Sequence, residues 1–142
     1  MNSPAEDIKD LILLLAPTHV RAYGTDLFIS EQPAYEDVSD LYPTIMVLFD
    51  TGGFPDEPNA ALEISKPTVN MQVIGPRDDY SAAWDKANSI ISALHGTCNQ
   101  TVSGSSRIIG LWSEGPPIFL GKDSYRRSIF SCNFRMERVP IT

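Results

Sequence analysis

The stretch TVNMQVIGPRDDYSAAWDKANSIISALHG, residues 68–96, places a strand directly before a helix and decides the fold class. Apolar and polar side chains alternate over its first seven residues, with Val69, Met71 and Val73 on one face. A period of two is typical of a strand with one dry and one wet face. The Gly75-Pro76 pair predicts the end of this strand.

The second half of the stretch predicts an amphipathic helix over Tyr80–Leu94. Asp79 is a favourable N-cap, and Gly96 supplies a C-terminal stop. Its apolar residues fall on one stripe, which is typical of a helix face that packs into a core rather than of a cofactor site. The stripe consists of Tyr80, Ala83, Trp84, Ala87, Ile90, Ile91 and Leu94.

A second amphipathic helix is predicted over Pro4–Ala16. Ser3 can cap it, and Glu6 stands three residues after the cap, where it completes a capping box. Apolar residues then follow at i, i+3, i+4 and i+7 until Pro17 ends the run. These residues are Ile8, Leu11, Ile12 and Leu15, with Leu13 and Leu14 widening the face.

Other apolar or alternating runs predict the remaining strands. They are Asp26–Ser30, Thr44–Phe49, Arg107–Trp112 and Phe130–Glu137. The run Ile118–Leu120 can resume the strand that begins at Arg107. The polar or glycine-rich and proline-rich segments Asp50–Lys66 and Asn99–Ser106 are predicted to be irregular. We therefore expect a single α+β domain over residues 1–142, with an antiparallel or mixed β-sheet of about four to five strands and two amphipathic helices packed on one face.

Composition excludes several classes of function. The 18 acidic and 11 basic residues give a formal charge of −7, the wrong sign for a protein that holds nucleic acid by neutralising phosphates. Cys98 and Cys132 form no C-x-x-C motif, which disfavours a zinc site or a redox pair. No apolar run approaches the ~18 residues that a membrane helix needs, and the acidic N-terminus does not resemble a secretory signal. We expect a protein made in the cytoplasm, without a metal, cofactor or membrane.

One short motif suggests chemistry, because the run into Phe49-Asp50-Thr51-Gly52 matches the way retroviral-type aspartic proteases present their catalytic carboxylate. Ile108-Ile109-Gly110 lies downstream at a plausible spacing for the second signature of such a protease. Two helices are out of place in that nearly all-β fold, and the second carboxylate could come only from a dimer. We favour a strand-ending turn at Asp50 and Gly52, with a retropepsin-like protease as the less favoured alternative.

No other catalytic pattern is present in the sequence. It contains no G-x-S-x-G motif, no phosphate loop ending in Gly-Lys-Ser/Thr and no His-Glu-x-x-His motif. We therefore assign no catalytic residue and expect no enzymatic activity.

Several segments together resemble the tail terminators of long-tailed bacteriophages, small tail-completion proteins also catalogued as minor capsid or neck proteins. The resemblance lies in the order and spacing of segments and spans nearly the whole chain. It covers the N-terminal helix, Thr44–Gly53, Val69–Gly75, Asp79-Tyr80, Ala87–Gly96, Pro117–Asp123 and Tyr125–Arg135.

The resemblance implies a structural virion protein located at the head-proximal end of the tail. Such proteins form a ring, usually six-fold, that caps the tail tube, stops its polymerisation and presents a surface to head-completion proteins. The implied partners are further copies of the chain as a hexamer, the tail tube protein and a head-completion or connector protein. Double-stranded DNA would pass through the channel without specific binding, which an acidic wall favours.

The subunit or tube interface is predicted from apolar and glycine-rich residues at the end of one strand and in the loop after it. These residues are Phe49, Asp50, Gly52, Gly53, Phe54, Leu62 and Ile64. Two alternatives keep an assembly role. One is another head-to-tail component such as a stopper or adaptor, and the other is the same domain in a phage-derived injection apparatus of a bacterium.

Overall fold

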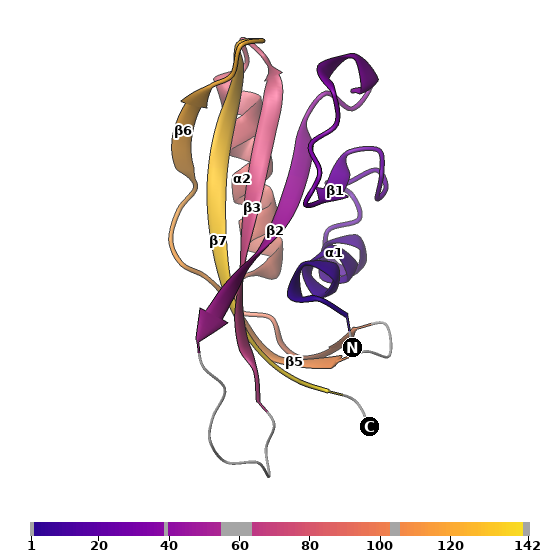
Figure 1. Cartoon of the computed structure of the whole chain (residues 1–142), viewed down its shortest axis with the longest axis vertical. Helices are drawn as coiled ribbons and strands as arrows, with labels where there is room; N and C mark the ends of the chain where they lie inside the picture. Colours follow the sequence, from indigo (N-terminus) through magenta and orange to yellow (C-terminus); the bar gives the residue numbers. More distant parts are fainter. Residues whose placement is uncertain (1, 39, 55–63, 103–105, 141–142) are drawn as a thin grey trace.

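The computed structural model describes residues 2–38, 40–54, 64–102 and 106–140, which form a curled mixed sheet with helices beside it (Figure 1). In chain order the elements are α1 (Pro4–Leu15), β1 (Leu27–Ile29), the 3-10 turn η1 (Tyr35–Asp37), β2 (Ile45–Phe54), β3 (Lys66–Arg77), α2 (Tyr80–Leu94), β4 (Cys98–Val102), β5 (Ser106–Ser113), β6 (Ile118–Lys122) and β7 (Arg127–Pro140). The predicted α+β class is confirmed. The predicted number of strands was too low, because the sheet in the described part of the chain has seven.

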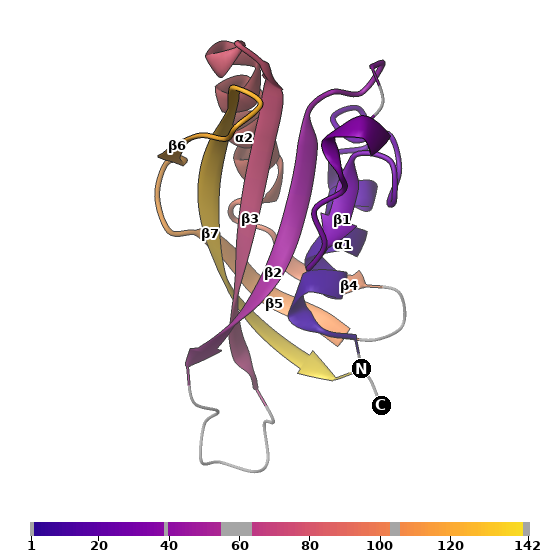
Figure 2. The same ribbon diagram turned by 45° about the horizontal axis from the view of Figure 1, so that its top comes forward.

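The strands follow the order β1-β2-β3-β7-β5-β4, and β6 pairs with β7 beside this path. β1 and β2 are parallel, whereas the other pairs are antiparallel, so the sheet is mixed. One edge of β7 pairs with β3, and its other edge pairs first with β6 and then with β5. The second half of β7 bends away from β3 together with β5 (Figure 2).

The extra strands come from segments whose composition hides them. β4 has the sequence CNQTV, and most of its side chains are exposed because it is an edge strand paired with β5 alone. An edge strand with polar residues on both faces shows no alternation. The prediction that Asn99–Ser106 is irregular is therefore wrong for Asn99–Val102, which belong to β4, while residues 103–105 lie outside the described residues. Ile118–Leu120 belongs to a separate strand, β6, rather than resuming β5.

β2 runs through both glycines to Phe54, so the predicted strand-ending turn at Asp50 and Gly52 is wrong. Its register with β3 shifts between Asp50 and Gly53, which marks a β-bulge. Gly53 has φ +139, and a Cβ added there would lie 2.3 Å from the Lys66 carbonyl oxygen. Glycine is therefore required at this position for β3 to approach β2 so closely.

The core lies between the helices and one face of the sheet. The alternation predicted in β3 is confirmed, since Val69, Met71 and Val73 are buried on that face. Met46 and Leu48 of β2 join the same cluster. From the helices the cluster receives Ile8, Leu11 and Ile12 of α1 and Ala83, Ala87, Ile90 and Leu94 of α2. Both helices thus cover one face of the sheet, as predicted.

Candidate assembly surfaces

Asp50 supports the N-terminus of α1. Its Oδ1 accepts a hydrogen bond from the Ala5 backbone N–H at 2.8 Å, while Ser3 Oγ accepts from the Glu6 N–H at 3.2 Å in the predicted capping box. Pro4 has no N–H, so the free donors of the first helical turn are satisfied. A carboxylate at a helix N-terminus is also favoured by the helix dipole. The structure therefore gives Asp50 a stabilising contact within its own chain.

The other residues of the predicted interface lie mainly at the distal end of β2. Phe49 is half-buried opposite Asn70, and Gly52 and Gly53 are exposed at the bulge. Ile64 is half-buried just before β3. Leu62 and the side chain of Phe54 lie outside the described residues. The contact of this set with a neighbouring subunit stays a prediction.

β6 presents an apolar surface that the sequence analysis did not assign to an interface. Ile118, Phe119 and Leu120 are 53%, 47% and 55% exposed, so neither face of the strand is covered. The Tyr80 ring of α2, itself 49% exposed, lies 5.4 Å from the Phe119 ring. We call these four residues the β6 patch. β6 pairs with β7 along one edge, and no other strand among the described residues pairs with it.

A signal for the β6 patch exists in the sequence. Ile118, Phe119 and Leu120 are consecutive apolar residues between Pro117 and Gly121. Successive side chains of a strand point to opposite faces, so such a run is either buried on both faces or exposes apolar groups on at least one face. Which of the two applies depends on the position of the strand in the sheet. Here the strand lies at an edge, so the apolar groups are exposed.

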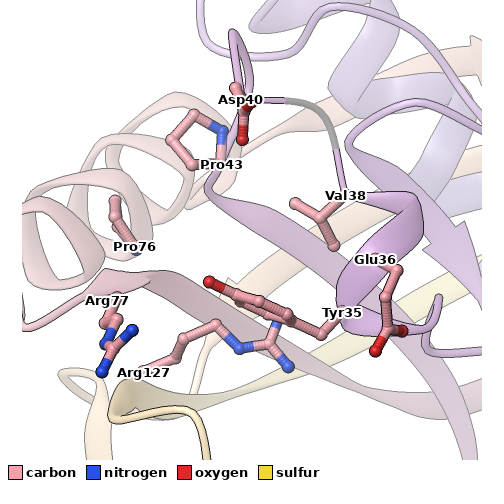
Figure 3. Close-up of a pocket in the computed structure, with 8 residues that line it drawn as sticks. All are labelled: Tyr35, Glu36, Val38, Asp40, Pro43, Pro76, Arg77 and Arg127. Atoms are coloured by element: carbon pink, nitrogen blue, oxygen red, sulfur yellow. The ribbon is translucent and has the colours of Figure 1, made fainter.

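A pocket of about 200 Å³ lies between η1, the end of β3 and the start of β7 (Figure 3). Tyr35 at its side stacks on Tyr125, with ring centroids 4.2 Å apart and planes 5° from parallel. Arg127 is 3% exposed, and its Nε donates to Asp123 Oδ2 at 2.8 Å. The full lining is Tyr35, Glu36, Val38, Asp40, Pro43, Pro76, Arg77 and Arg127. The sequence does not predict this pocket, because the pocket joins segments far apart in the chain.

The charge of Asp123 is stabilised beside this pocket. Burial on its own would raise the pKa of Asp123, but hydrogen bonds from the backbone and side chain of Arg127, the charge of its guanidinium and the Tyr125 N–H together hold the pKa of Asp123 below its usual value. The Asp123 carboxylate is therefore ionised at neutral pH and forms an ion pair with the Arg127 guanidinium.

Two further classes of site are absent from the described residues. No helix there is long and apolar enough to cross a membrane. The described residues also contain no group of three or more His, Cys, Asp or Glu side chains that could hold a metal ion.

Comparison with known proteins identifies the family. Curated protein sequences give no match. Among solved structures, the fold is similar to a chain of the virion of a native gene transfer agent (GTA) particle, with a TM-score of 0.61 and 15% identity over 96% of this chain and 94% of that chain. A family model described as bacteriophage tail terminator protein matches residues 14–140. The resemblance found in the sequence is thus confirmed, and the chain belongs to the bacteriophage tail terminator family.

Proposed function

We propose that this structural tail protein forms a ring of six copies on the head-proximal end of the tail tube, stops the polymerisation of the tube and provides the surface for head attachment. The chain acts as one domain over residues 1–142. Its partners are its own copies, the tail tube protein and a head-completion or connector protein, and its role is not enzymatic. Membership of the tail terminator family supports this placement.

The β6 patch is the observation that carries the proposal of self-assembly. An edge strand with free backbone groups and exposed apolar side chains invites pairing with another chain, and monomeric proteins normally blunt such edges with charge or cover them. β6 instead exposes Ile118, Phe119 and Leu120 together. Burial of these side chains against the next copy would remove apolar surface from water and stabilise the contact.

In a ring, each subunit contacts its two neighbours head to tail, so a patch on one subunit meets a different patch on the next. Each subunit therefore needs two different interface surfaces. The β6 patch supplies one surface. The second surface is supplied by the predicted interface residues of β2, which lie on a different strand of the sheet. These are Phe49, Asp50, Gly52 and Gly53. We infer that the two surfaces meet between neighbouring subunits.

The acidic composition supports passage of DNA through the ring. The formal charge of −7 on each chain is multiplied by the number of subunits. A channel wall of like charge repels the phosphate backbone and lets double-stranded DNA slide without specific binding.

Electron microscopy of tails assembled with and without the protein tests the role. Overlong tubes in its absence support termination of the tube. Normal-length tails that lack heads would instead favour a stopper or adaptor role and contradict termination.

The role of the β6 patch is tested by the mass of the ring, measured by light scattering after size exclusion. The ring can be isolated from tails or formed by the free chain. Phe119→Glu places a charge in the patch and is expected to reduce the mass to that of the monomer. Leu14→Glu, at a residue 54% exposed on α1, is the matched control and is expected to leave the ring intact. A ring that survives Phe119→Glu would show that β6 is not the interface.

A further inference from the structure

We propose that the pocket between η1 and the start of β7 binds the carboxylate of an aspartate or glutamate side chain on a partner protein. Arg127 supplies the fixed hydrogen-bond donor, and Arg77 supplies a second positive charge. The inference goes beyond ring formation, because it concerns a different surface from the β6 patch. It is also testable on the isolated chain.

The first reason is a buried donor without an acceptor. Arg127 is 3% exposed, and its Nη1 has no hydrogen-bond partner in the described part of the chain. Buried polar groups in native proteins almost always have partners, and an unpaired donor on a charged group is especially costly. Asp123 takes the Nε–H, which lies on the opposite side of the guanidinium from Nη1. Arg127 lines the pocket, so this unpaired donor lies in the wall of a cavity that can hold an acceptor oxygen.

The second reason is that the guanidinium is held in place before any ligand arrives. Its central carbon lies 5.2 Å from the Tyr35 ring centroid and 5.6 Å from that of Tyr125. The salt bridge to Asp123 fixes it from the other side. A preorganised group loses little conformational entropy when it binds, so the cost of recognition is reduced.

Arg77 adds charge at the mouth of the pocket. Its side chain is 57% exposed, and its Nε lies 3.9 Å from Asp78 Oδ2, a loose pairing that leaves it able to turn toward a ligand. In the view of Figure 3, Arg127 lies below Tyr35, and Arg77 lies to the left of it, beneath Pro76. A guanidinium group that turns toward the ligand from Arg77 would add donors for the second oxygen of a carboxylate.

The walls favour a protein carboxylate over a phosphate of nucleic acid. Glu36 and Asp40 also line the pocket, and they repel a phosphodiester backbone that carries many charges. A single carboxylate meets less repulsion. Val38, Pro43 and Pro76 supply apolar walls that suit the methylene groups of a glutamate or aspartate side chain.

Nuclear magnetic resonance of the isolated chain tests the proposal, with propionate as the probe for an acidic side chain and inorganic phosphate as the competitor. Propionate is expected to shift the Arg127 Nε–H signal saturably. Arg77→Gln is expected to weaken this binding several-fold, whereas Arg107→Gln, at an exposed arginine of β5, is expected to leave it unchanged. Glu36→Gln removes a repelling charge and is expected to tighten it.

A second variant keeps the proposal testable without touching the Asp123–Arg127 pair. Val38→Trp fills the pocket from its side and is expected to abolish the propionate shift while the protein stays folded. Three results would overturn the proposal. The first is no saturable shift in the unmodified chain, and the second is tighter binding of phosphate than of propionate. The third is stronger propionate binding in Arg77→Gln together with weaker binding in Glu36→Gln. The last result would mean that the pocket takes a cation beside Glu36 and Asp40.

Discussion

Asp7 on the first helix and Arg138 near the end of the last strand form a buried ion pair, with Arg138 Nη1 2.7 Å from Asp7 Oδ2. Asp7 is completely buried, and Ser106 Oγ donates to the same carboxylate oxygen at 2.5 Å. Arg138 Nη1 also donates to the Asn2 carbonyl oxygen at 2.9 Å. Asp7, Ser106 and Arg138 thus connect α1, β5 and β7.

Removal of Arg138 is expected to destabilise the protein strongly. Arg138→Met leaves the Asp7 carboxylate buried without its counter-charge, and breaking a buried pair in this way costs about 3–5 kcal/mol. Urea unfolding measures the free energy. The double variant Asp7→Leu/Arg138→Met removes both charges and is expected to lose much less than the sum of the single changes. Additive losses would show that the ion pair is not coupled.

Gly75→Ala is expected to separate α2 from β3. A Cβ at residue 75 would lie 2.6 Å from the Ala83 Cβ and 3.2 Å from its Cα. Such overpacking costs about 1–3 kcal/mol, which thermal unfolding would detect as a lower Tm. Ala83→Gly creates the missing space, so it is expected to be less harmful in the Gly75→Ala background than in the unmodified chain. Equal effects in both backgrounds would contradict the close contact.

Asp50 is expected to act on stability through α1. Asp50→Ala removes the acceptor of the Ala5 N–H, and loss of a side-chain acceptor at a helix N-terminus costs about 0.5–2 kcal/mol. Asp50→Asn keeps an acceptor oxygen and is expected to lose less. Chemical denaturation of the two variants measures the difference. Equal unfolding midpoints for Asp50→Ala and the unmodified chain would contradict this role.

The Asp123–Arg127 pair predicts a loss of stability in acid. The pKa of Asp123 is lowered in the folded state, so its contribution is fully present above the unfolded value of about 3.9 and is lost as the pH falls through the folded pKa. Asp123→Asn removes this contribution. The free energies of unfolding of the variant and the unmodified chain are therefore expected to converge below about pH 4. A difference that stays constant well below pH 4 would contradict the assignment.

The two cysteines are expected to differ sharply in reactivity. Burial raises the pKa of Cys132 to about 12, whereas Cys98 is exposed. Because the thiolate is the reactive form, iodoacetamide at mildly alkaline pH is expected to modify one thiol in the folded protein and both in urea. Peptide mass spectrometry identifies the site. Rapid modification of Cys132 in the native protein would contradict its burial.

The sequence was most informative where local pattern and tertiary burial agree. The capping box of Ser3 and Glu6 and the alternation of Val69, Met71 and Val73 could be predicted, because each depends on residues close together in the chain. The same holds for α2, whose predicted bounds over Tyr80–Leu94 match the structure.

The features that sequence reasoning missed depend on which strands become neighbours. The bulge that carries β2 through Gly52 and Gly53 exists because β3 lies alongside, whereas glycines in isolation favour a turn. The exposure of Phe119 follows from the edge position of β6. The pocket at Arg127 requires η1 and β7 to meet, and local spacing in the sequence contains no information on that encounter.

The central place of β7 also has a consequence for how the chain folds during synthesis. This strand follows the other six along the described part of the chain, yet it lies between β3 on one side and β5 and β6 on the other. Until residues 127–140 have left the ribosome, the edges of β3, β5 and β6 lack the strand that joins them, and such unpaired edges are prone to aggregation. Completion of the sheet is therefore a late event that depends on contacts distant in sequence, which slows folding. A nascent chain that pauses before Arg127 is the form in which we expect chaperones to be needed most.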